Sequence, residues 1–210
     1  MKTYLLPRLA VIGFLFAAVS GCVTAGGEIN AGRRDLLYGD PNVALVRFQN
    51  AAAISPNALY YSNMPEGTWT YVGRAYYVTG RLPEARESFE RAIVRSEYDS
   101  LARLYLGLTL ARQGDRGRAL PEIESGLRGI NDWLNYVEYH FTYSYGIYWD
   151  TTKVIRAEIG NNLAMIRSGV DWPRLLASSE WVGRKMEEEI EHSRYGERED
   201  HRRDSEGKQP

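Results

Sequence analysis

The sequence has little of what disulfide frameworks and most metal sites are built from. It contains one cysteine and three histidines in 210 residues. A single cysteine cannot form an intramolecular disulfide, a thiolate zinc cage or an iron–sulfur cluster. The charges nearly cancel, with 26 basic against 27 acidic side chains, whereas nucleic-acid binding needs a cluster of unpaired Lys and Arg. We therefore expect no metal site, no cofactor and no nucleic-acid partner.

Long hydrophobic runs are scarce as well. The run from Leu9 to Val19 is shorter than the roughly 20 residues that a helix needs to cross a bilayer. It follows Lys2 and Arg8 and ends in small residues, which is the pattern of a secretory signal. Residues 1–21 are therefore predicted to be a signal peptide, and no later segment is apolar enough to span a membrane.

The end of this run, Ala18-Val19-Ser20-Gly21-Cys22, resembles the lipobox of bacterial lipoproteins. The resemblance implies cleavage after Gly21 and a diacylglycerol on Cys22; two buried acyl chains anchor a protein stably. In the family's sorting pattern, Val23 in place of Asp implies the outer membrane. We expect an outer-membrane, lipid-anchored, periplasm-facing protein, with residues 22–33 as its lipidated end and flexible tether. The alternatives are a signal peptide cut before an incidental cysteine, or an uncleaved anchor.

The middle of the chain repeats itself with an offset of 34 residues. Gly73 falls on Gly107, Gly80 on Gly114, and Ala85 on Ala119. Small residues at these positions allow close helix approach, and Gly80 and Gly114 suit left-handed helix ends. Pro121 is expected in the first turn of its helix. An earlier copy of the repeat matches at Gly39, Asp40, Ala44, Phe48, Ala51 and Pro56. Its Ala44 precedes Ala85 by 41 residues instead of 34. The seven extra residues predict a loop over Asn57 to Glu66.

This repeat resembles the tetratricopeptide repeat (TPR), with the pattern residues Trp69, Val72, Gly73, Tyr76, Ala85, Phe89 and Ala92. The resemblance implies a stack of antiparallel helix pairs with a concave face lined by the first helices. The predicted fold is all-α: a TPR-like helical-repeat solenoid over residues 34–130, followed by additional C-terminal helices. About three repeats are expected. The first is degenerate, because the stretch around Gly32 to Tyr38 matches poorly.

In the TPR family the groove positions correspond to Thr70, Arg74, Tyr77, Val78, Leu101, Leu104, Leu108 and Arg112. The predicted partner-binding residues among them are Arg74, Tyr77, Leu104, Leu108 and Arg112. The leucines do not belong to the row that packs on their own partner helix, so they must face a later segment of the chain or another protein. Packing by the C-terminal helices is the preferred interpretation for the leucines. The two arginines and the tyrosine are the better candidates for contact with a partner.

Residues 131–194 are predicted to form an aromatic-rich segment and further helices. Eight aromatic side chains lie between residues 131 and 150. Tyr and Trp platforms suit stacked sugar or peptide ligands, although the same rings could close the hydrophobic end of the solenoid. The predicted aromatic surface consists of Tyr143, Tyr145, Tyr148 and Trp149.

Two helices are expected after this segment. Asp150 is predicted to cap the first by accepting from Thr152 or Lys153. The second begins near Pro173, with an apolar stripe and with Glu187 and its acidic neighbours largely on other faces. Residues 195–210 have almost no apolar side chain, which predicts a disordered charged tail.

The sequence shows no nucleophile elbow, phosphate loop or metal-binding helix, so we do not expect an enzyme. The predicted function is a membrane-anchored periplasmic TPR adaptor or scaffold that binds a protein or peptide partner in envelope assembly or secretion. The alternative is a small-ligand or glycan-binding lipoprotein that uses the Tyr/Trp cluster at residues 133–149.

Overall fold

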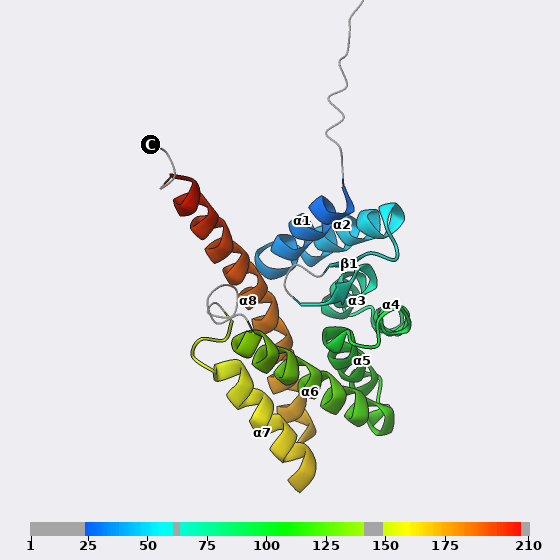
Figure 1. Ribbon diagram of the computed structural model, residues 1–210. Coiled ribbons are helices and arrows are strands. Elements are labelled where there is room, and N and C mark those ends of the chain that lie inside the picture. The colour runs from blue at the N-terminus through cyan, green and yellow to red at the C-terminus, as the bar shows by residue number, and fades with distance from the viewer. Residues whose placement is uncertain (1–23, 61–63, 141–148, 207–210) are drawn as a thin grey trace, which may run out of the picture.

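The computed structural model describes residues 24–60, 64–140 and 149–206 of the chain. Over these residues the fold is all-α, with one pair of two-residue strands (Figure 1). The elements are α1 (Ala25–Tyr38), α2 (Pro41–Ile54), β1 (Leu59–Tyr60), β2 (Glu66–Gly67), α3 (Thr68–Val78), α4 (Leu82–Arg95), α5 (Ser100–Arg112), α6 (Arg116–His140), α7 (Val154–Ser168) and α8 (Trp172–Glu206). In the part of the chain that is described, no helix combines the length and the apolar composition of a membrane span.

Helices α1 to α6 form three helical hairpins in series, with α2 packed on α3 and α4 packed on α5 (Figure 1). Short links join the two helices of each hairpin, which makes them antiparallel neighbours. Gly80 follows α3 with φ +76° and Gly114 follows α5 with φ +91°. Both glycines therefore adopt the left-handed conformation that the sequence predicts for these helix ends.

The same close contact occurs inside every hairpin. A glycine of the first helix faces a large side chain of the second, sixteen residues later. An added Cβ would lie 2.5 to 2.6 Å from that side chain, which leaves room for glycine alone. The three pairs are Gly32 with Phe48, Gly73 with Phe89, and Gly107 with Ile123. The predicted roles of Gly73 and Gly107 are confirmed, and Gly32 shows that the first hairpin keeps this contact although its sequence matches poorly.

Helices α7 and α8 pack beside the hairpins (Figure 1). The apolar stripe of α8 is buried at Leu175, Val182, Met186 and Ile190. These side chains belong to the same hydrophobic cluster as Leu104 and other residues of α5. The prediction that the C-terminal helices dock on the hairpins is confirmed.

Two segments predicted to be irregular are helical. Residues 25–33 belong to α1 and not to a flexible tether, because Thr24 caps the helix by accepting from the Gly27 amide (3.1 Å) and Ile29 is buried in the core. The predicted disordered tail is wrong from Tyr195 to Glu206, which continue α8. Ion pairs one turn apart, such as Arg202 with Glu199, favour that continuation.

Three smaller predictions also need correction. The loop over residues 57–66 contains strand β1, whose Leu59 and Tyr60 pair antiparallel with β2. Pro121 lies beyond the first turn of α6, because that helix begins at Arg116. The Asp150 carboxylate caps α7 through the amides of Ile155 (3.0 Å) and Arg156 (3.1 Å), and not through Thr152 or Lys153.

Candidate functional site

The five predicted partner-binding residues lie on α3 and α5. Helix α8 packs against α5, and its Glu187 and Glu180 accept hydrogen bonds from Arg74 and Tyr77 of α3. Leu104 and Leu108 are fully buried in the core. They are not partner-binding residues in this structure, because the chain's own helices cover them. The interpretation that the leucine row packs within the chain is the correct one.

Arg74 also has a partner within the chain. Its Nη1 donates to the carboxylate of Glu187 on α8, and the Nε of Arg33 on α1 donates to the other oxygen of the same carboxylate. All three side chains are buried, with side-chain exposure of 3% or less. Arg33 precedes Arg74 by the 41 residues that relate Gly32 to Gly73. Equivalent positions of the first two hairpins therefore hold one carboxylate of α8.

The charges of this cluster control its ionisation. Burial by itself would raise the pKa of Glu187, but Arg33 and Arg74 outweigh that effect and lower this pKa to about 2. Glu66 on β2 is also fully buried, and its carboxylate interacts with the buried Tyr71 phenol. Burial and the charge of Glu187 raise the pKa of Glu66 to about 8, against the opposing effect of the two arginines. Glu187 is therefore charged and Glu66 mostly protonated at neutral pH.

The sequence predicts no site role for Arg33, Glu66 or Glu187. Glu187, in a run of three glutamates, is predicted to lie largely off the apolar face of its helix, whereas the structure buries it completely. Arg33 had a usable signal, because the offset of 41 residues that aligns Ala44 with Ala85 also aligns Arg33 with Arg74. No pattern in the sequence points to Glu66.

Tyr77 and Arg112 border a cleft that α8 leaves open, with a volume of about 530 Å³. The Arg112 guanidinium lies 4.2 Å from the centre of the Tyr77 ring. Both side chains donate to the carboxylate of Glu180 on α8, Arg112 at 2.7 Å. Further lining comes from α1, α3, α5 and α8 through Leu36, Leu37, Val78, Tyr105, Trp181 and Arg184.

This cleft combines apolar walls with accessible cations. Arg112 and Arg184 have side-chain exposures of 38% and 62%, and Val78 is 54% exposed. Guanidinium groups at the edge of an apolar surface suit a ligand that carries a carboxylate beside an apolar group. The geometry can therefore bind a peptide segment of that chemistry.

The predicted aromatic surface is only partly within the described residues. Trp149 is buried and packs edge-on against Trp133 with ring centres 4.4 Å apart, so it belongs to the core and not to a binding surface. Tyr143, Tyr145 and Tyr148 lie outside the described residues, as does the predicted lipidation site Cys22.

Within the described ranges, no group of three or more His, Cys, Asp or Glu side chains is arranged to hold a metal ion. No protein-family model matches the chain, and no curated protein sequence is similar to it.

Proposed function

We propose that this chain is an adaptor or scaffold lipoprotein that binds its partner without chemically transforming it. Lipid on Cys22 anchors it in the outer membrane, facing the periplasm, and a TPR-like stack of helix pairs presents the binding surface. The partner is a periplasmic protein or peptide in envelope assembly or secretion. The glycine contact repeated in three hairpins supports a TPR-like architecture, and the signal and lipobox patterns support the anchor.

One observation carries the adaptor function: Tyr77 and Arg112, expected at groove positions, border the same open cleft. Arg112 keeps more than a third of its side chain exposed although it pairs with Glu180. An incoming carboxylate could share this guanidinium, because Arg presents several donors in one plane. Confinement to the membrane would then raise the effective concentration of the bound partner without any further contact.

Replacing Arg112 and Arg184 by Ala is expected to weaken capture of a periplasmic partner about tenfold, since two solvent-exposed charge contacts contribute up to about 1 kcal/mol each and about 1.4 kcal/mol is a factor of ten in affinity. Arg74→Ala is unsuitable because Arg74 is buried in the Glu187 cluster. The measurement is partner recovery in a crosslinked pull-down with the full-length protein, read by quantitative mass spectrometry, with helicity checked by circular dichroism.

The matched control is Arg86→Ala. Arg86 has 37% side-chain exposure and pairs with Glu90 much as Arg112 pairs with Glu180, but it does not line the cleft. Partners recovered from the control and lost from the double variant identify the cleft as their binding site. Equal recovery from both variants would contradict the proposed site.

Cys22→Ala is expected to transfer the protein from the membrane fraction to the soluble periplasmic fraction. The acyl chains supply the anchor, at about 0.8 kcal/mol per buried methylene. Fractionation by ultracentrifugation and incorporation of labelled palmitate measure the effect. Ser20→Ala keeps the cysteine and should stay with the membrane. If the Cys22→Ala protein also sediments with membranes, the lipid anchor is not what holds it there.

A further inference from the structure

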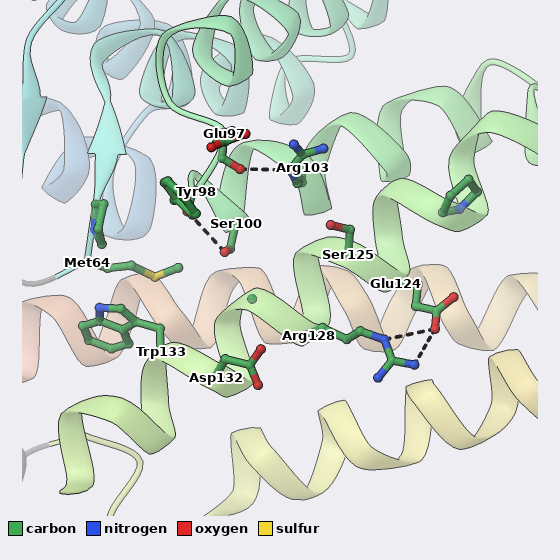
Figure 2. A pocket seen from close by; sticks show the side chains of 13 residues that line it. Met64, Glu97, Tyr98, Ser100, Arg103, Glu124, Ser125, Arg128, Asp132 and Trp133 are labelled. Carbon is green, nitrogen blue, oxygen red and sulfur yellow. Dashed lines mark hydrogen bonds and ion pairs between the residues drawn. The ribbon is translucent and has the colours of Figure 1, made fainter. Parts of the chain in front are cut away.

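A second cleft, of about 630 Å³, is lined by no residue of α8, and Figure 2 shows the side chains that line it. Its floor is one face of α6, where lining residues recur every three or four positions from Pro121 to Trp133. At 1.5 Å per residue this face is about 18 Å long. The start of α5 and the link before it form the opposite side, and the volume lies within the range of small-ligand sites.

Aromatic side chains gather at one end of this cleft. Figure 2 shows Tyr98, Met64 and Trp133 grouped there. Tyr98 is 77% exposed, an uncommon environment for a large ring. Trp133 is half-buried and braced by the edge-on contact with Trp149. Trp133 therefore offers aromatic surface that needs little reordering when a ligand binds, and the exposed ring of Tyr98 lies at the same end of the cleft.

The rest of the cleft is polar and its cations are already neutralised. Arg128 donates to Glu124 (2.6 and 3.1 Å), and Arg103 donates to Glu122 (3.2 Å). Asp132 is exposed at the aromatic end (Figure 2), and no hydrogen bond or ion pair joins its carboxylate to another described residue. Such a carboxylate can accept hydrogen bonds from two neighbouring hydroxyl groups.

We propose that this cleft binds a neutral saccharide of a few linked rings. The apolar C–H face of a sugar ring packs on Tyr98 and Trp133, and its hydroxyl groups bond to Asp132. The lining of this cleft carries the carboxylates of Glu97, Glu124 and Asp132 against the guanidiniums of Arg103 and Arg128, and this excess of negative charge disfavours an anionic ligand. The elongated shape suits a chain of rings better than a single compact molecule. This binding is independent of the adaptor cleft and involves none of residues 141–148.

The test is isothermal titration of the full-length protein, held in a detergent without a sugar head group, with chitotetraose, cellotetraose and maltotetraose. At least one of these neutral tetrasaccharides should bind saturably at millimolar concentration and change the tryptophan fluorescence. Its affinity should be the same at about 0.1 and about 1 M salt, since no net charge is neutralised.

Two variants assign the binding to this cleft. Tyr98→Ala is expected to weaken it roughly three- to tenfold, the range of an aromatic packing contact, and Asp132→Asn should weaken it as well. Tyr38→Ala is the matched control, since Tyr38 is 73% exposed on α1 and outside the cleft, and it should bind like the unmodified protein.

Three results would overturn the proposal. One is the absence of heat and fluorescence change with all three saccharides. Another is saccharide binding that Tyr98→Ala leaves unaltered. The third is salt-sensitive binding of a lysine-rich peptide in the cleft while the saccharides do not bind. None of these results bears on partner capture at Arg112, so the two proposals fail separately.

Discussion

Glu187→Ala is expected to lower the free energy of unfolding by about 3–5 kcal/mol, the cost of removing one partner from a buried ion pair. The substitution leaves the Arg33 and Arg74 guanidiniums in an interior where each side chain is only 3% exposed. Glu191 lies 3.4 Å from Arg33 and retains part of that interaction, so Arg74 bears most of the loss. The Tm should fall by roughly 6–20 °C. Urea unfolding followed by circular dichroism measures the change.

The neighbouring residue supplies the control for this prediction. Glu188 is partly exposed and pairs with Lys185 on the helix surface, so Glu188→Ala should cost less than about 1 kcal/mol. If Glu187→Ala costs no more than Glu188→Ala, Glu187 does not hold the hairpins to α8.

A triple variant separates the contribution of the buried charges to stability from that of side-chain packing. Replacing Arg33 and Arg74 by Met together with Glu187→Leu removes the buried ion pairs of Glu187 while keeping side chains of similar length. Because desolvation offsets much of the attraction in a buried ion pair, this triple variant should recover most of the stability that Glu187→Ala loses. If the triple variant is no more stable than Glu187→Ala, the attraction within the ion pairs exceeds the cost of desolvating their charges.

The repeating part of the fold could be predicted because its signal is local. Gly73 and Gly107 stand at a fixed distance from the side chains they face, and the two glycines that follow α3 and α5 mark helix ends. Sequence periodicity reports such contacts between neighbouring helices. It also predicts that the leucine row faces either a later part of the chain or another protein, and the structure shows the first of these.

The ionic cluster could not be predicted in the same way, because its members come from distant parts of the chain. Glu187 is 113 residues from Arg74 and 154 from Arg33. On α8 it adjoins the buried Met186, but in sequence it is one of three consecutive glutamates, a pattern typical of a solvated face. Only the docking of α8 on the first two hairpins makes it buried.

Burial of an apolar side chain such as Trp149 could not be predicted from the sequence either. A cluster of rings predicts packing and binding equally well, because both use the same apolar surface. Trp149 is buried by its contact with Trp133, whereas Tyr98, outside the aromatic-rich segment, keeps its ring exposed. Which ring remains accessible depends on the path of the chain around it.

Raising the pH from about 5 to about 9 is expected to destabilise the protein, and Glu66→Gln to remove most of that loss. The unperturbed pKa of 4.5 describes Glu66 in the unfolded chain, whereas burial and Glu187 raise the folded-state pKa to about 8. Between these values the folded protein holds a proton that the unfolded chain has released. The stability linked to that proton is present below 4.5 and is lost as the pH rises through about 8.

The other groups of the cluster fix the shape of this profile. The lowered pKa of Glu187, about 2 in the folded protein, adds stability above 4.5 that is lost as the pH falls through about 2. Burial raises the pKa of Asp99, which adds to the loss at higher pH. Arg33 and Arg74 remain charged throughout. The stability linked to this cluster should therefore be greatest near pH 5.

Urea unfolding at about pH 5, 7 and 9 tests the role of Glu66. The unmodified protein should lose on the order of 3 kcal/mol across this range. Glu66→Gln keeps the size of the side chain but cannot ionise, so its profile should be flatter and its stability at pH 9 higher than that of the unmodified protein. Glu122→Gln, at a partly exposed glutamate paired with Arg103, should leave the slope unchanged. Parallel profiles for Glu66→Gln and the unmodified protein would mean that Glu66 is not the buried carboxyl that takes up the proton.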